Sequence, residues 1–380
     1  MTLDRPVWAV GLMTGTVLDG NIDVALLQTD GQDVVSFGRY ALSPYLAETV
    51  DMLRECQAQA LQWQFDGPEP ALFATTEKQL TLEQSAAVLE LLHNAGLSAE
   101  DVAVVGFHGQ TVLHRPPEGT TCGKTRQLGD GSLMARTLGI DVVHDFRSAD
   151  MRAGGQGAPL SAVYHKCLLK KIRACGDTAI VNLGGVGNLS WWDGAEKLVA
   201  FDTGPANAPI NDFVRASGYG DYDVDGRLAA LGTVDETRLA SLLDHPYFKV
   251  QYPKSLDRFD FTSTMAEGCN LHDGASLLTT FSAAAVGSAL DLLPRRPQRL
   301  IVCGGGRHNK TLLQALKDRT QTQVDTAESV GWRGDAIEAE CFAYLAVRAL
   351  RGLPSSFPDT TGVCSPVCCG VINQSADRLY

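Results

Sequence analysis

Two glycine-rich turns, each placed next to an apolar strand, constrain the fold of this chain more than any other feature. The first joins strands expected over 7–13 and 22–27, and the second, at 184–185, follows a strand expected over 179–183. Neither turn leads directly into a helix or ends in Gly-Lys-Ser/Thr, which disfavours a Walker A loop and a dinucleotide-binding turn. Glycine turns let backbone N–H groups converge on an anion. Because one turn opens each half of the chain, we predict two lobes that hold a nucleotide's phosphates; two ordinary tight hairpins are the alternative.

The composition excludes several classes of protein. The chain has 380 residues, enough for two cores, and its 44% hydrophobic and 20% charged residues are typical of a globular protein. A formal net charge of −12 argues against nucleic acid or an anionic membrane as partner. We find no signal-peptide pattern and no apolar run of about 20 residues, so we expect a cytoplasmic protein.

The ten cysteines are dispersed, which favours reduced thiols over a disulfide framework. Cys364, Cys368 and Cys369 lie close together near the C-terminus, but the second half of a zinc ligand set is missing there. A metal site in this segment is therefore the weaker interpretation.

Strand-like and helix-like runs alternate along the chain, which predicts α/β layers. Further strands are expected over 102–107, 140–143, 198–201 and 300–303. Helices are expected over 81–94, 160–171, 235–243, 276–293, 309–318 and 335–350.

Two sequence positions beyond expected strands are candidates for nucleotide binding and catalysis. Gly304, Gly305 and Gly306 precede a helix and can pack closely against a flat base or ribose, although a flexible turn is the alternative. Asp202 is expected just beyond a strand, next to a Gly-Pro turn. It can act as a general base toward water or a hydroxyl, or it can cap the following turn.

A group of polar residues before the middle of the chain predicts a pocket of sugar size, because hydroxyl-rich ligands need many donors and acceptors. Arg147 suits an anionic group of the ligand, whereas His108 alone is equally well explained as a core histidine. The group comprises His108, Gln110, Thr111, Asp145, Arg147 and Gln156.

Glu338 lies one position from the apolar stripe of the helix expected over 335–350. From periodicity alone, a solvated helix face is the preferred interpretation for Glu338, as it is for Glu340.

In this order, the motifs resemble the anhydro-N-acetylmuramic acid kinase family. The resemblance runs from about Val7 to Gly362. Each motif is weak alone, but the ordered set is specific. The resemblance rests on the segments 11–20, 108–111, 145–147, 154–159, 182–185, 201–205, 222–226, 253–255 and 303–306.

The resemblance implies an actin-like ATPase and sugar kinase fold, with two ribonuclease-H-like lobes around a central cleft. We expect an N-terminal lobe over 1–159, joined by the returning segment 351–380, and a C-terminal lobe over 160–350. The resemblance also implies ATP, Mg²⁺ and a homodimer.

The reaction implied is the ATP-dependent conversion of 1,6-anhydro-N-acetylmuramic acid and water to N-acetylmuramic acid 6-phosphate, in peptidoglycan recycling. Asp202 matches the base that activates water at C1, and Glu338 resembles a second catalytic carboxylate, which overrides the periodicity argument. Asp19 is expected near the metal, through water. The expected ATP-binding residues are Gly15, Thr16, Val17, Leu18, Asp19, Gly20, Asn21, Ile22, Asp23, Gly184, Gly185, Gly304, Gly305 and Gly306. The expected substrate-binding residues are His108, Gln110, Thr111, Asp145, Arg147, Gln156 and Asp202.

The chain departs from the family pattern in three places. The first loop has Thr14 and Val17 where the family usually has Ser, and Asn21 looks like an added residue. Asp130 stands at a usual Asn, and Ala206 stands at a usual Gly. We predict that activity survives these changes. The alternatives are an actin-like kinase for another small sugar or acid, and a non-catalytic ATP-dependent sensor.

Overall fold

The computed structural model describes residues 5–15, 20–117, 119 and 121–375. The chain divides into two compact units. Unit 1 comprises 1–167 and 336–380, and unit 2 comprises 168–335. The boundaries between the lobes that were predicted from the sequence are at 159/160 and 350/351.

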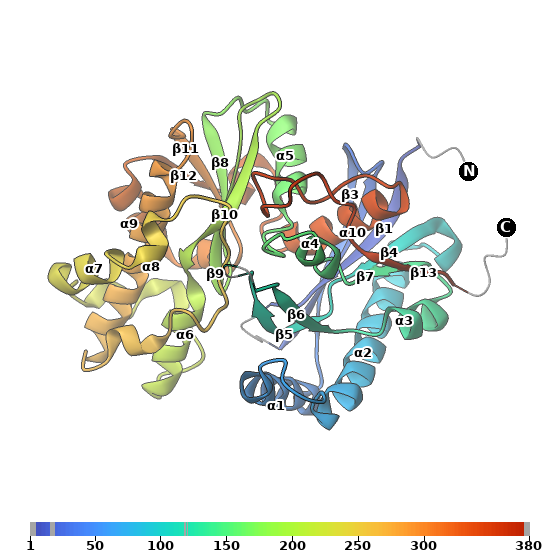
Figure 1. Cartoon of the computed structure of the whole chain (residues 1–380), viewed down its shortest axis with the longest axis horizontal. Helices are drawn as coiled ribbons and strands as arrows, with labels where there is room; N and C mark the ends of the chain where they lie inside the picture. The colour runs from blue at the N-terminus through green and yellow to red at the C-terminus, as the bar shows by residue number, and fades with distance from the viewer. Residues whose placement is uncertain (1–4, 16–19, 118, 120, 376–380) are drawn as a thin grey trace. The chain divides into compact units, whose positions relative to one another are not determined.

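Unit 1 is built on a six-stranded sheet in the order β13-β7-β4-β1-β2-β3 (Figure 1). β1, β2 and β3 are antiparallel neighbours, whereas β4 pairs parallel with β1, and β7 pairs parallel with β4. A separate hairpin, β5–β6, follows β4. The strands are β1 (Val7–Met13), β2 (Asn21–Thr29), β3 (Val34–Pro44), β4 (Val102–Phe107), β5 (Gln110–Arg115), β6 (Lys124–Leu128), β7 (Val142–His144) and β13 (Val371–Asn373).

The helices of unit 1 cover both faces of this sheet. They are α1 (Ala47–Trp63), α2 (Ala71–Ala95), α3 (Gly131–Leu138), α4 (Ser148–Arg152), α5 (Ala162–Lys171), which crosses the division between the units, and α10 (Ile337–Leu350). α10 packs along β1, β2 and β4, which is why it belongs to unit 1. A Cβ atom at Gly11 or Gly106 would overlap the α10 backbone, so glycine permits this close approach. On the other face, Leu12 and Leu26 share a core with Val88 of α2.

Unit 2 contains a five-stranded sheet in the order β10-β9-β8-β11-β12. The strands are β8 (Thr178–Leu183), β9 (Val186–Trp192), β10 (Leu198–Pro205), β11 (Arg299–Cys303) and β12 (Gln323–Thr326). The helices are α6 (Asn207–Ala216), α7 (Glu236–Leu243), α8 (Leu271–Asp291) and α9 (Lys310–Thr320). Val181 and Val302 of the sheet share a core with Val286 of α8 and Leu316 of α9.

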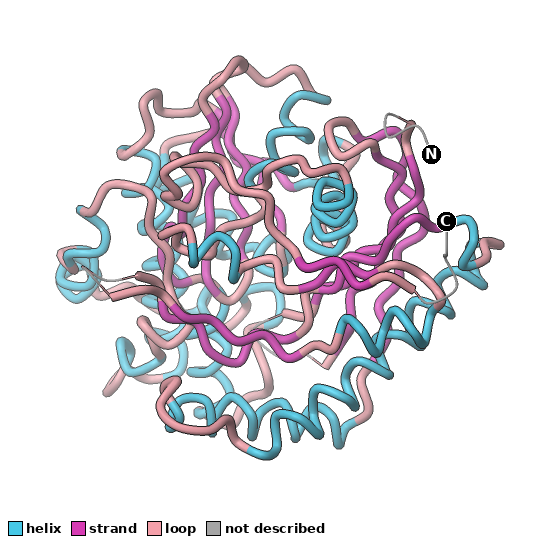
Figure 2. Tube along the Cα trace, turned by 45° about the vertical axis from the view of Figure 1, so that its right-hand side comes forward, coloured by secondary structure: helices cyan, strands magenta, loops and turns pink. Residues whose placement is uncertain are grey.

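The two sheets have the same strand pattern. In each, three antiparallel strands come first, and the fourth strand pairs parallel with the first and the fifth with the fourth. Figure 2 shows strands (magenta) and helices (cyan) in both units. This is the ribonuclease-H-like order of the predicted fold, so the α/β class with two such lobes is confirmed.

The structure also bears on membrane-spanning helices and disulfide bonds. No helix of the described residues has both the length and the apolar character needed to cross a membrane. The described residues include all ten cysteines, and no disulfide joins any two of them.

Candidate active site

The glycine turn of unit 2 connects β8 and β9 and is held by the start of α6. The Gly184 carbonyl accepts the N–H of Asn207 at 2.9 Å. The Gly185 carbonyl accepts the N–H groups of Ala206 and Ala208 at 3.1 and 3.2 Å. A Cβ atom at Gly184 would lie 3.5 Å from the Val186 carbonyl oxygen, an ordinary contact, so close packing does not require glycine there.

The triple glycine lies beside the same turn. The Asn207 side chain donates to the Leu183 carbonyl at 2.8 Å, and a Cβ atom at Gly306 would lie 3.2 Å from its Oδ1. Gly304 has φ +73° next to the side chain of Asn182, where a Cβ atom would collide. The position therefore requires glycine, both for its backbone conformation and for its close packing. The structure thus brings together two motifs that are more than 100 residues apart.

Asp202 lies within β10, not beyond the strand as predicted from the sequence, because β10 continues to Pro205 past an irregularity after Asp202. Its side chain is 5% exposed, and its Oδ2 accepts the N–H of Leu256 at 2.9 Å. Ala206 is the N-cap residue of α6, without a side-chain cap. Asp202 is therefore not the N-cap residue of α6.

Two buried polar atoms lie next to Asp202 on the paired strands. Asn188 faces Asp202 across the β9–β10 pair, and Thr203 follows Asp202. Asn188 Oδ1 and Thr203 Oγ1 have no hydrogen-bond partner among the described residues. Buried polar atoms are nearly always paired, so these two atoms fit a polar ligand. The Thr203 hydroxyl can donate to a phosphate oxygen, whereas the Asn188 amide oxygen can only accept.

The first glycine turn is only partly within the described residues. Thr16, Val17, Leu18 and Asp19 lie outside them. Gly15 follows β1 closely, and Gly20 (φ +86°) accepts the N–H of Tyr45 at 2.9 Å.

The residues after the first turn belong to β2. Asn21 begins the strand opposite Pro44, Ile22 is buried, and Asp23 accepts the Tyr40 hydroxyl at 2.7 Å. The apparent extra residue Asn21 is therefore accommodated in regular strand pairing.

The described residues do not form a metal site by themselves. Among them, no group of three or more His, Cys, Asp or Glu side chains is arranged to hold an ion. The expected ligand Asp19 lies outside the described residues. The C-terminal cysteines, all of which are described, contribute no such group either.

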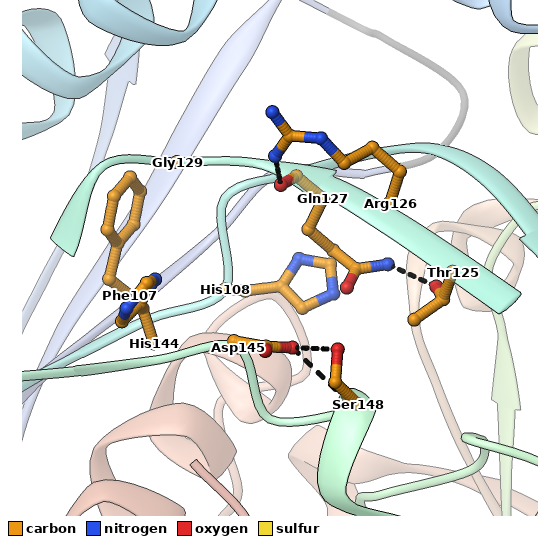
Figure 3. Close-up of a pocket in the computed structure, with 9 residues that line it drawn as sticks. All are labelled: Phe107, His108, Thr125, Arg126, Gln127, Gly129, His144, Asp145 and Ser148. Carbon is orange, nitrogen blue, oxygen red and sulfur yellow. Dashed lines mark hydrogen bonds between the residues drawn. The ribbon is translucent and has the colours of Figure 1, made fainter. Parts of the chain in front are cut away.

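Of the seven residues predicted to bind the substrate, Asp202 belongs to unit 2 and the other six belong to unit 1. In unit 1 a pocket of about 160 Å³ lies beside β6 and β7. Figure 3 shows the His108 ring in this pocket, with Gln127 of β6 and Asp145 after β7. The lining residues are Phe107, His108, Thr125, Arg126, Gln127, Gly129, His144, Asp145 and Ser148. The three β6 residues were not predicted, since a strand of mostly polar residues carries little signal.

His108 is 3% exposed and held by two contacts. Its Nε2 accepts from Arg147 at 3.0 Å, because guanidinium is only a donor, so its Nδ1–H donates to the Gly109 carbonyl at 2.9 Å. Burial and the nearby Arg147 lower the pKa of His108 to about 3. The ring is therefore neutral near pH 7. The same Gly109 carbonyl accepts the Thr14 hydroxyl at 3.0 Å, which ties the first turn to His108 within unit 1.

Arg147 also fixes the glycine loop that contains Gln156. It donates to the Gly157 carbonyl at 2.7 Å, while the Gly157 N–H donates to Asp150 at 2.6 Å. Asp150 is fully buried and also accepts the Thr361 hydroxyl. The backbone N–H of Gln156 donates to the Thr361 carbonyl at 2.6 Å. Asp150 gave no sequence signal, because its partners are a loop backbone and a residue 211 positions away.

The other predicted substrate residues lie on the same elements. Gln110 Oε1 and Thr111 Oγ1, at the start of β5, are buried and lack a partner among the described residues. Asp145 has φ +48°, and its Oδ1 accepts the N–H and hydroxyl of Ser148 at 3.2 and 2.6 Å.

Glu338 and Glu340 occupy the first turn of α10 in unit 1. Glu338 is partly exposed. The expectation of a solvated Glu340 is wrong: it is 1% exposed and accepts the Tyr164 hydroxyl at 2.6 Å. Burial and this carboxylate raise the pKa of Tyr164. Asp202 belongs to unit 2, so the structure describes the two predicted catalytic carboxylates separately.

Of two further departures from the family pattern, one is explained. Ala206 has φ −129° and ψ −110°, outside the main allowed regions for a residue with a Cβ atom, and nothing in the structure explains alanine at this position. Asp130 caps α3 by accepting the N–H of Leu133 at 2.8 Å.

Known proteins were compared with the whole chain. The profile of the family described as anhydro-N-acetylmuramic acid kinase matches residues 7–375. The anhydro-N-acetylmuramic acid kinase of Brucella anthropi is 62% identical over 363 residues, covering 96% of this chain and 98% of the relative. That of Mesorhizobium japonicum is 60% identical with the same coverage. Among solved structures, the activator of the 2-hydroxyisocaproyl-CoA dehydratase from Clostridium difficile has a TM-score of 0.44 and 12% identity, covering 91% of this chain and 96% of that one. Because the family profile matches nearly the whole chain and the relatives are 60–62% identical, this chain belongs to the anhydro-N-acetylmuramic acid kinase family.

Proposed function

We propose that this chain is an ATP-dependent kinase that converts 1,6-anhydro-N-acetylmuramic acid and water to N-acetylmuramic acid 6-phosphate and ADP. The observation that carries the proposal is the match to kinases of this name at 62% identity over 96% of the chain. The reaction would serve peptidoglycan recycling in the cytoplasm.

Asp202 is the proposed general base. It takes a proton from the water that attacks C1, the C1–O6 bond breaks, and O6 forms a bond to the γ-phosphorus as the bond to ADP breaks. The support is that Asp202 is buried and fixed in position by the N–H of Leu256. A positioned base typically contributes about 10²–10⁴-fold to a rate. Glu338 is proposed as a second catalytic carboxylate, on the family resemblance.

The phosphates of ATP are proposed to contact both glycine turns, and the adenosine the triple glycine. The support in unit 2 is the buried Thr203 hydroxyl, which has no partner among the described residues and can donate to a phosphate oxygen. Residues 15–23 supply the proposed contacts in unit 1. Mg²⁺ is the proposed ion that accompanies ATP. Proteins usually bind it through the phosphates and one or two carboxylates, and Asp19 is the proposed carboxylate.

The sugar is proposed to bind the polar residues of unit 1, including His108, Gln110, Thr111, Asp145, Arg147 and Gln156. A neutral His108 and two unpartnered oxygens suit the hydroxyl and amide groups of an amino sugar. Arg147 is the proposed partner of the lactyl carboxylate, and its bonds to His108 and Gly157 hold it in a defined orientation. A homodimer is retained as a prediction.

A coupled ADP-release assay with purified protein tests the proposal. We expect ADP release with 1,6-anhydro-N-acetylmuramic acid and little with plain N-acetylmuramic acid, which lacks the strained ring. A preference for another sugar or small acid in the same panel would support the alternative kinase. ATP binding without turnover on any member of the panel would support a sensor.

A further inference from the structure

Asp202 and two other residues of unit 2, Lys254 and Tyr247, form a closed ring of hydrogen bonds. The Asp202 N–H donates to the Lys254 carbonyl at 3.1 Å, and Lys254 Nζ donates to the Tyr247 carbonyl at 2.8 Å. The Tyr247 hydroxyl donates to the Asp202 carbonyl at 2.5 Å. The ring therefore fixes the backbone of Asp202 on both sides of its side chain.

The Lys254 ammonium group lies in an unusual place for a cation. The residue is only 5% exposed, and its Nζ lies 4.4 Å from the centre of the Tyr247 ring and 5.5 Å from that of Phe201. Burying an ammonium group costs free energy unless it is compensated. The aromatic faces compensate part of this cost, and the attraction of Asp202 favours the charged form of Lys254.

We propose that Lys254 is a positioning residue of the reaction, which fixes the backbone of Asp202 and keeps its carboxylate ionised as a base. The proposal rests on the assignment of Asp202 as the base. It gives a role to the segment 253–255, which the sequence analysis singled out without one.

The charge of Lys254 sets the expected pH dependence. Burial lowers the pKa of Lys254 to about 8, against the opposing effect of Asp202. Above pH 8 the ammonium group becomes neutral, the Asp202 carboxylate loses its nearby cation, and the rate should fall. Removing the cation should also raise the pKa at which Asp202 becomes active, because a neighbouring cation favours the carboxylate.

The other titratable groups around this pair are Tyr247 and Asp260. Burial, Asp202 and Asp260 together raise the pKa of the Tyr247 hydroxyl above its usual range, so it stays protonated throughout. Asp260 is an exposed residue. The change near pH 8 is therefore assigned to Lys254.

The test is a pH profile of kcat for the wild type, Lys254→Arg and Lys254→Met, with Lys249→Met as control. Lys249 is an exposed lysine five positions away, paired with Asp244. We expect Lys254→Met to lower kcat at least tenfold while the KM for ATP changes less than about twofold. Lys254→Arg should recover part of that loss and lose the decline near pH 8, because arginine stays charged. Lys249→Met should behave as the wild type.

Wild-type kcat in Lys254→Met, or a decline near pH 8 that persists in Lys254→Arg, would overturn the inference. Thermal unfolding shows whether each variant folds; if Lys254→Met does not, the profile of Lys254→Arg decides alone. An inactive wild type, or an active Asp202→Asn, would instead refute the proposed function.

Discussion

In unit 1, Gly11 and Gly106 lie within central strands directly beneath α10, whereas in unit 2 the corresponding strands end in glycines that surround Asn182 and Asn207. Both sheets have the same strand order. The strand glycines of unit 1 remove side chains so that a helix can approach the sheet. The loop glycines of unit 2 let the triple glycine pack closely against the end of β8, next to the side chains of Asn182 and Asn207.

The comparison shows that the same residue type serves packing in one lobe and the candidate site in the other. A sequence motif does not distinguish these roles, because both appear as glycine near the end of an apolar strand. Substitutions of the strand glycines of unit 1 should therefore mainly lower stability, whereas substitutions of the loop glycines of unit 2 should also raise the KM for ATP.

The largest effect is expected for Gly11→Ala in unit 1. The new Cβ atom would overlap the Ala339 carbonyl, and overpacking against backbone costs about 3 kcal/mol or more, since no rotamer can relieve it. Urea unfolding measures the loss. Gly139→Ala, with φ +66° and open space around its Cβ, controls for backbone conformation and should cost about 1–2 kcal/mol. Equal losses would show that α10 can move away from the sheet.

A smaller effect on stability, with a separate effect on nucleotide, is expected for Gly304→Ala in unit 2. Its φ of +73° and the nearby Leu183 carbonyl, 2.8 Å from the new Cβ, predict a loss of about 1–3 kcal/mol. The KM for ATP should rise at least tenfold. Gly331→Ala (φ +78°, nothing near its Cβ) is the control and should leave that KM unchanged. An unchanged KM in Gly304→Ala would remove the triple glycine from the nucleotide site.

A third effect is a pH dependence of the stability of unit 1. Burial is the main cause that lowers the pKa values of His108, His114 and His165 to about 3 from 6.5. Between pH 6.5 and 3 the unfolded chain therefore binds more protons than the folded one, so stability is full above pH 6.5 and falls on acidification. Each histidine contributes up to about 1.4 kcal/mol per pH unit.

Replacing one of these histidines tests that slope. His165→Gln should reduce the pH dependence of the unfolding free energy by about one proton. Hydrogen exchange of unit 1 at pH 7 and 5, corrected for intrinsic rates, should show the same change. A slope identical to that of the wild type would mean that His165 titrates normally.

The sequence predicted the elements with strong periodicity. β1 is found at the predicted residues, and α9 begins within one residue of its predicted start. Other elements were missed, among them the long elements α1 and β3. The mostly polar β6 and the three-residue edge strand β13 were missed as well, because their pairing depends on neighbours that periodicity does not show.

The site shows the same limit. Asp202 and the glycines were singled out because glycine-rich and Gly-Pro turns have local signatures, although Asp202 lies within β10 and not beyond it. The burial of Glu340 depends on Tyr164, 176 positions away, and Lys254 reaches Asp202 through a loop without periodicity. Such partners are set by tertiary packing.

The most direct test of the central claim compares Asp202→Asn with the wild type in the ADP-release assay, together with ATP binding. If Asp202 is the base, the anhydro-sugar-dependent rate should fall by about 10²–10⁴-fold while ATP affinity stays within about twofold. A rate like that of the wild type in Asp202→Asn would contradict the account.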